Sequence, residues 1–173
     1  MKRLSTLLML TTCLALNGCG LLGDSPETPE YKPSPVENFM ANAGDTFTIE
    51  LNRSQLEWGT FRFTGSRGLR YGEGYLKIPK HVARSLRLFN NNYTDGNDII
   101  GENIFNATSS DGFFNGPLRS EGCSTAGDPY AKQFAGDKDL MALGYWYAQI
   151  NAQVGDLIRV TFTSPTDVVL EKI

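Results

Sequence analysis

Hydrophobic and polar positions alternate in several short segments of this chain, as they do in β-strands with one buried face. The clearest case is the segment 46–51, where Phe47, Ile49 and Leu51 fall on one side. The same pattern recurs in 58–63, 76–78, 99–107, 113–114, 157–163 and 168–172. The last two segments flank the turn sequence Ser164-Pro165-Thr166-Asp167, so they predict a C-terminal β-hairpin.

Two other segments have the spacing of helices. Pro79 lacks the N–H that a strand needs and fits the first turn of a helix, so we expect a helix to follow it. Its apolar face consists of Val82, Ala83, Leu86 and Phe89, and its basic face of Lys80, Arg84 and Arg87. A second apolar stripe, which Gly155 is expected to end, consists of Leu140, Leu143, Tyr147, Ile150 and Val154.

About seven strands and two short helices follow from these patterns, and they do not alternate as a parallel βαβ arrangement requires. The sequence therefore predicts a mainly β (α+β) domain, a small and partly open β-barrel with helices covering its ends. Between these elements we expect a glycine-rich basic turn at 65–74, a polar loop at 90–96 and an irregular connection at 117–137. A length of 173 residues with 40% apolar residues fits one globular domain with tails.

The N-terminus has the pattern of an export signal. Lys2 and Arg3 precede a mostly apolar run at 4–16, which is short for a membrane-spanning helix. The next residues, Leu16-Asn17-Gly18-Cys19, resemble the lipobox of bacterial lipoproteins. That resemblance implies a signal peptide at 1–18 and acyl chains, palmitate among them, on Cys19. Gly20 then implies a lipid-anchored protein of the outer membrane, on its periplasmic or its surface face. The alternative is an ordinary secretory signal with a chance cysteine.

After the signal, the segment 19–37 carries four prolines among polar residues and has little to bury. We expect a lipidated, extended tether that reaches about 3 Å per residue, followed by a β-barrel-like binding domain at 38–173. Cys123 is then the one thiol left in an oxidising compartment. It is either a buried, inert thiol or the partner of a thiol on another chain.

Charge is distributed unevenly along the chain, whose net charge is −3. Between residues 53 and 87, eight basic residues oppose two acidic ones, which gives +6; between 89 and 173, five oppose eleven, which gives −6. The basic segment 53–87 suits a polyanion. We assign polyanion binding to Arg53, Arg62, Arg67, Arg70, Lys77, Lys80 and Arg84. Trp58 and Tyr75 point outward by alternation and are candidates for base stacking. Alternatively, these charges form a solvated face around the barrel.

Several motifs together resemble the DNA-binding pseudobarrel domains, which include the plant B-three domain and the effector domains of some restriction enzymes. The resemblance rests on the segments 51–63 and 74–83, and on Gly136-Asp137-Lys138, Trp146-Tyr147, Gly155-Asp156 and Ser164-Pro165 in 135–173. It implies a fold that grips DNA with two arms, the first at 53–62 and 65–74. The apolar run 140–143 departs from the family pattern, because a basic contact is expected near the second arm.

Catalytic patterns are missing from the sequence. His81 is the single histidine, and no acid, Cys or Ser constellation accompanies it. Asp95-Gly96-Asn97-Asp98 lacks the spacing of a calcium loop, and no Gly-Lys-Ser/Thr follows the glycines of 65–74. We therefore expect a non-catalytic domain without a metal or small-molecule cofactor. Its partner is expected to be nucleic acid or another polyanion. The alternative is an envelope protein-interaction or structural lipoprotein that keeps the barrel without binding DNA.

Overall fold

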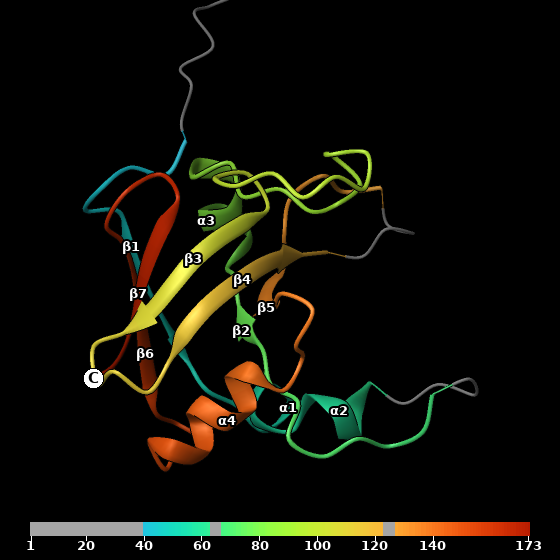
Figure 1. Ribbon diagram of the computed structural model, residues 1–173, viewed down its shortest axis with the longest axis vertical. Coiled ribbons are helices and arrows are strands. Elements are labelled where there is room, and N and C mark those ends of the chain that lie inside the picture. Colours follow the sequence, from blue (N-terminus) through green and yellow to red (C-terminus); the bar gives the residue numbers. More distant parts are fainter. Residues whose placement is uncertain (1–39, 63–66, 123–126) are drawn as a thin grey trace, which may run out of the picture. The chain divides into compact units, whose positions relative to one another are not determined.

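The computed structural model describes residues 40–62, 67–122 and 127–173 (Figure 1). They belong to one compact unit that extends over Glu37–Ile173. The predicted signal peptide, the tether, Cys19 and Cys123 lie outside the described residues. Among the residues that are described, no helix has the length and apolar character that crossing a bilayer requires.

Within the described part of the chain, seven strands form one mixed sheet that curls into a nearly closed barrel (Figure 1). The strands are β1 (Thr46–Glu50), β2 (Leu76–Lys77), β3 (Ile104–Ser109), β4 (Asn115–Glu121), β5 (Gln133–Gly136), β6 (Leu157–Phe162) and β7 (Asp167–Lys172). Their order is β1-β6-β7-β3-β4-β5-β2, in which β3 and β7 are parallel and the other neighbours antiparallel. The predicted fold class, mainly β with a partly open barrel, is confirmed.

Four short helices accompany the sheet in the described residues, where the sequence predicted two. They are α1 (Arg53–Leu56), α2 (Trp58–Phe61), α3 (Lys80–Ser85) and α4 (Ala142–Gln149). Asn52 caps α1, because its side-chain oxygen accepts a hydrogen bond from the Gln55 N–H at 3.1 Å. Pro79 stands directly before α3 in an extended conformation, as its fixed φ predicts.

The barrel interior is filled by aromatic side chains in edge contact. The Phe105 ring lies 5.6 Å from that of Phe134 and 5.8 Å from that of Phe162, and all three are fully buried. Burial of each such side chain stabilises the fold by about 1.5–3 kcal/mol. Trp146 of α4 closes one end of the barrel, where its indole N–H donates to the Asp111 carboxylate at 3.1 Å.

The segment 58–63 is not the strand that its alternation predicted. Residues Trp58–Phe61 form α2, in which the Arg62 N–H donates to the Trp58 carbonyl at 2.8 Å. Phe61, expected in the core, is 54% exposed. The cause is a close backbone approach at Gly59, where a Cβ would lie 2.1 Å from the Arg70 carbonyl oxygen. That approach packs α2 against the segment after it.

The connection at 117–137, predicted to be irregular, contains β4 and β5. Pro117 lies inside β4, opposite Asn106, and its carbonyl accepts a hydrogen bond from the Asp137 N–H at 3.0 Å. Both predicted helices are shorter than expected, since α3 ends at Ser85 and α4 at Gln149. Gly155 does not end α4; it lies in the turn before β6 with a φ of +95°. The predicted first strand and C-terminal hairpin are confirmed as β1 and β6–β7.

Candidate functional site

The predicted first arm is held to the barrel by the buried side chain of Gln55. Its amide donates to the Glu50 carbonyl at 3.0 Å, and its side-chain oxygen accepts from the Lys77 N–H at 3.2 Å. The side chain is fully buried. Gln55 thereby joins α1 to the end of β1 and to β2. Residues 53–62 and 67–74 are called the basic arm below.

An aromatic and cationic stack lies on this arm. The Arg62 guanidinium lies over the Trp58 ring, 4.7 Å from its centre. The Tyr75 ring lies 5.3 Å from that of Trp58 and is tilted from it by 59°. These three side chains are called the Arg62–Trp58–Tyr75 stack below. The Tyr75 hydroxyl is 3.1 Å from that of Ser54. Trp58 and Tyr75 are half-buried, whereas Arg62 is exposed. The structure thus brings together the two aromatic residues predicted to stack bases and one predicted cation.

Two of the predicted cations are paired with carboxylates. Arg53 contacts Glu57 at 3.1 Å on the surface of α1. Arg67 forms an ion pair with Glu73, whose side chain is 2% exposed. The second carboxylate oxygen of Glu73 is buried without a hydrogen-bond partner. Because desolvation of a lone carboxylate is costly, the charge of Arg67 serves to neutralise Glu73 and is less available to a bound anion.

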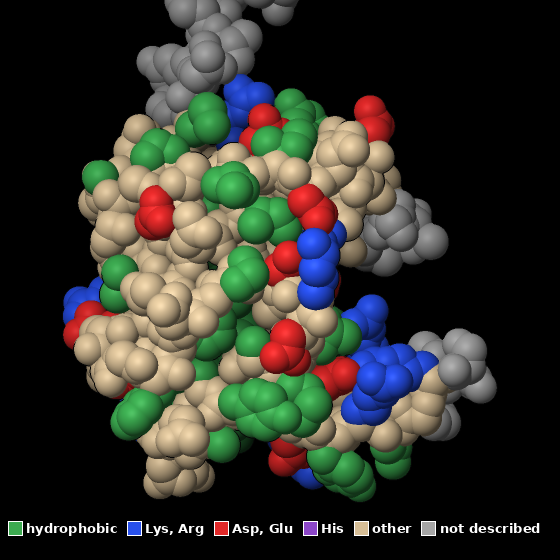
Figure 2. All heavy atoms as spheres, in the orientation of Figure 1, with side chains coloured by type: hydrophobic (Ala, Val, Ile, Leu, Met, Phe, Trp, Pro, Cys, Tyr) green, Lys and Arg blue, Asp and Glu red, His purple; other side chains and the backbone are tan. Residues whose placement is uncertain are grey.

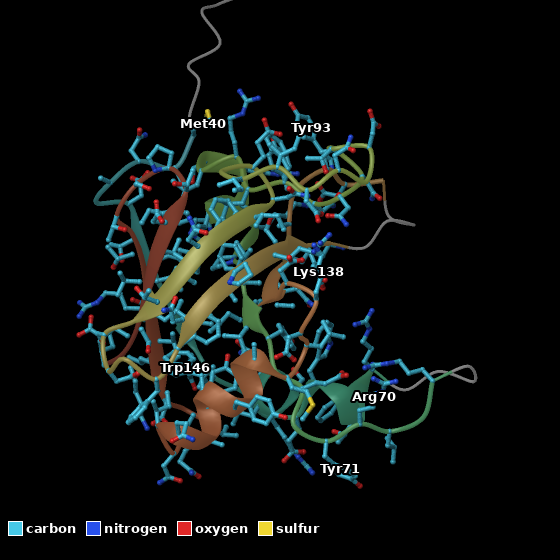
Figure 3. The ribbon with its side chains drawn as sticks, in the orientation of Figure 1. Met40, Arg70, Tyr71, Tyr93, Lys138 and Trp146 are labelled. Carbon is cyan, nitrogen blue, oxygen red and sulfur yellow. The ribbon has the colours of Figure 1, made fainter. Side chains whose placement is uncertain are left out.

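Arg70 is exposed, and its side chain has no ion pair within the described residues. Its backbone N–H donates to the Gly59 carbonyl at 3.1 Å, which fixes this part of the arm to α2. Figure 3 shows Arg70 and Tyr71 on the segment that follows α2, at the lower right. Lys and Arg side chains gather over the same end of the molecule in Figure 2.

A second group of cations surrounds a hollow of about 380 Å³ between β2, α3 and the segment before β5. We call it the lysine groove; Lys77, Lys80 and Lys132 line it, with Ile78, Ala131 and Tyr130 as its apolar part and Asp128 as its one carboxylate. The three lysines are exposed and have no ion pair in the described part of the chain. The Arg84 guanidinium lies 5.9 Å from the Tyr130 ring.

A carboxylate lies in the same hollow as Arg62. Glu121 of β4 lines, with Arg62 and Asn90–Asn92, a hollow of about 240 Å³. Burial raises the pKa of the Glu121 carboxyl above its ordinary value, although Arg62 and a 3.3 Å hydrogen bond from Gln133 act against that rise. A negative charge at Glu121 therefore opposes a second anion beside Arg62.

The polar loop that begins at Asn90 is held by a network of side-chain hydrogen bonds. The fully buried Asn103 amide donates to Asn91, to the Thr94 hydroxyl and to the Asn97 carbonyl at 2.9–3.1 Å. Arg119 of β4 pairs with Asp98 at 2.9 Å and with Asp137 at 2.5 Å. Lys138 lies near both carboxylates, at 3.7 and 3.8 Å. These cations are neutralised within the fold.

The seven predicted cations do not meet in one place. Arg53, Arg62, Arg67 and Arg70 lie on the basic arm, where Arg53 is paired with Glu57 and Arg67 with Glu73. Lys77, Lys80 and Arg84 lie at the lysine groove. Lys77 links the groups, because it follows Tyr75 on the outer face of β2. Sequence reasoning missed Lys132, Tyr130 and Glu121, which reach this region only through the pairing of β4, β5 and β2.

No protein-family model matches the chain. No curated protein matches it either. Among solved structures, the fold is similar to the N-terminal domain of Helicobacter pylori LlaJI.R1, with a TM-score of 0.44 and 12% sequence identity over 74% of this chain and 79% of that one.

Proposed function

We propose that the protein is a lipid-anchored, non-catalytic binding domain that holds nucleic acid by its phosphates and by base stacking. The observation that carries the proposal is the Arg62–Trp58–Tyr75 stack, placed beside cations that lack carboxylate partners in the described residues. Aromatic side chains contribute about 1–3 kcal/mol per stacked base, and neighbouring cations bind phosphates by releasing counterions. The resemblance of the sequence to DNA-binding pseudobarrel domains supports the same role.

Besides Arg62, four exposed cations supply phosphate contacts. Arg70 extends from the basic arm, and Lys77, Lys80 and Lys132 surround the lysine groove. Each is free of an ion pair within the residues described. Arg53 and Arg67 contribute less, because their charges are matched by Glu57 and Glu73. With about five phosphates neutralised, affinity is modest and falls steeply with salt.

The anchor is the second part of the proposal. The basic start, the apolar run and Cys19 in its lipobox-like context support lipidation of Cys19 and attachment to the outer membrane. Two or more acyl chains give stable attachment, whereas one gives reversible binding. Metabolic labelling with a palmitate analogue tests this part: the label is expected on the wild-type chain and absent from Cys19→Ser.

Filter binding at two salt concentrations tests nucleic-acid binding. The full chain is mixed with labelled duplex and single-stranded DNA at low and at near-physiological salt. Retention at low salt that decreases at the higher salt is expected. Absence of retention of both forms at low salt rejects the proposal.

A second candidate function is docking to an envelope protein. It is favoured by three exposed apolar side chains on the basic arm, Phe61, Leu69 and Tyr71, which are 54%, 55% and 77% exposed. Exposed aromatic and aliphatic side chains of this kind are frequent in protein interfaces. Affinity capture from envelope extracts separates the two functions. A partner retained by wild type and lost in Tyr71→Ala and Leu69→Ala supports docking, and recovery of no protein counts against it.

A further inference from the structure

A hollow of about 460 Å³ lies on the outer face of β3, β4 and β7, away from the basic arm. The side chains that line it include the polar residues Asn106, Thr108, Asn115, Thr163 and Asp167 and the ring of Pro117. In Figure 2 the left part of the molecule, where β3 and β7 lie in Figure 1, carries few charged side chains. The hollow is called the polar hollow below. No lysine or arginine lines it, so it is chemically unlike the proposed nucleic-acid site.

Strand register brings the lining residues together. Asn106 of β3 lies between Asp167 of β7 and Pro117 of β4, and Thr108 lies opposite Asn115. Because side chains alternate along a strand, these positions point outward while Ala107 and Val168 point into the core. The result places the amides of Asn106 and Asn115, the Thr108 hydroxyl and the Asp167 carboxylate on neighbouring strands of one outer face.

These groups keep most of their hydrogen-bonding capacity. The Asn106 side-chain N–H donates to one Asp167 oxygen at 3.1 Å, and the Asn106 side-chain oxygen has no partner among the described residues. Among the described residues, the Thr108 hydroxyl and the Asn115 amide have no protein partner. Amides and hydroxyls each supply both donors and acceptors. The polar hollow therefore offers convergent donors and acceptors without a net positive charge.

Asp167 excludes anions from this hollow. Hydrogen bonds from Ser164, Thr166 and Asn106 hold the pKa of its carboxyl below the ordinary value, so it is charged at neutral pH. A metal ion would need more carboxylate, His or Cys ligands than this lining provides, and the described residues contain no cluster of three such groups. The amide and hydroxyl groups of the lining therefore fit an uncharged ligand that carries many hydroxyls.

Apolar surface lies at one edge of the polar hollow. An adjoining hollow of about 270 Å³ shares Asn115, Gly116 and Pro117 with it. Its apolar lining includes Phe113, which is 60% exposed, and its carboxylates are those of Asp137 and Asp139. Sugar rings present an apolar C–H face to aromatic and proline rings and hydroxyls to polar groups, so the two adjoining hollows together match the two kinds of surface on a sugar chain. We propose that the polar hollow binds an uncharged oligosaccharide, independently of nucleic acid.

Isothermal titration calorimetry of the full chain tests this site, with chitotriose and maltotriose as separate probes. We expect at least one trisaccharide to bind with a Kd below about 1 mM. Asn115→Ala and Thr108→Val are expected to weaken that binding at least about fivefold, as the loss of a hydrogen bond of about 1 kcal/mol predicts. Thr48→Val is the matched control, because Thr48 is an exposed strand threonine outside the hollow.

Circular dichroism and thermal melting establish that the variants fold like wild type. Binding of neither sugar overturns the proposal, and so does binding that Asn115→Ala and Thr108→Val leave unchanged. Because Arg62 and Lys77 do not line the polar hollow, Arg62→Ala and Lys77→Ala are expected to retain sugar binding. A failure of nucleic-acid binding therefore leaves this result unaffected.

Discussion

The Arg62 guanidinium lies 4.7 Å from the centre of the Trp58 ring, on the face of a helix that the sequence alone predicted to be a strand. The two residues are one turn apart, so α2 itself creates the contact. Stacking orients the cation without neutralising it, and it leaves the guanidinium N–H groups available to phosphate. The local helix is thus what turns two candidate binding residues into one unit.

Trp58→Ala and Arg62→Ala should each weaken binding of single-stranded DNA by roughly 5- to 10-fold, as the loss of about 1–1.4 kcal/mol of stacking or charge predicts. Fluorescence anisotropy with a labelled strand measures the change. The double variant should lose less than the sum, because the residues act together. Phe61→Ala is the control on the same helix, and an equal loss in that variant would contradict a specific role for the stack.

Lys77→Ala, Lys80→Ala and Lys132→Ala should each reduce the salt dependence of DNA binding by about one phosphate contact. That is a change in slope of about 0.7 for single strands and 0.9 for duplexes. Lys138→Ala is the matched control, because Lys138 already lies near Asp98 and Asp137. A slope that is unchanged in all three groove variants would remove the lysine groove from the site.

Gly144→Ala should destabilise the protein by about 1–3 kcal/mol, despite the better helix propensity of alanine. A Cβ at Gly144 of α4 would lie 1.9 Å from the Gly72 carbonyl oxygen, so either α4 or the basic arm must move. Urea unfolding measures the loss. Gly116→Ala, where a Cβ would meet no atom within 4 Å, is the control and should be close to neutral.

Glu121→Gln should raise DNA affinity at neutral pH and make binding less sensitive to acid. Burial raises the pKa of Glu121 in the folded protein, so its contribution to stability is fully present below the ordinary value of 4.5 and is lost as the pH rises through the raised value. As the pH rises through the raised pKa, the Glu121 carboxyl also loses its proton, and its negative charge near Arg62 repels phosphate. Wild-type affinity should therefore increase on acidification, and anisotropy between pH 7 and 5 tests it against the variant.

An identical pH profile in wild type and Glu121→Gln would show that Glu121 does not face the bound anion. Arg119 and Asp137 are the other charged groups that act on Glu121, and Gln133 is its uncharged neighbour. Gln133→Leu keeps the charges and removes the 3.3 Å hydrogen bond to Glu121. It should raise the pKa of Glu121 further and move the acid response to higher pH.

The fold was predictable wherever one face of an element is buried. Phe47 and Ile49 in β1, and Val168 and Leu170 in β7, alternate because the barrel interior accepts every second side chain. The sequence misled at α2, because its apolar spacing fits a strand as well as a short exposed helix. Contact of Gly59 with the Arg70 carbonyl decides between them, and it involves residues beyond the local window.

The candidate site was predictable by residue type and not by arrangement. The basic segment 53–87 is visible in the sequence, but pairing of Arg67 with the buried Glu73 is a tertiary contact that composition does not reveal. Lys132 joins Lys77 through the pairing of β5 with β2, across more than fifty residues of chain. Pro117 concealed β4 because a proline ordinarily argues against a central strand.

The slope of log Kd against log salt for DNA binding by the full chain tests the central claim most directly. With phosphate contacts from Arg62, Arg70, Lys77, Lys80 and Lys132, we predict a magnitude of about 4, which falls to about 1 or less when the last four are changed to alanine. Thermal melting of that variant should match wild type, because the four side chains are exposed. No binding by wild type at low salt, or a slope that the fourfold variant retains, would contradict the account.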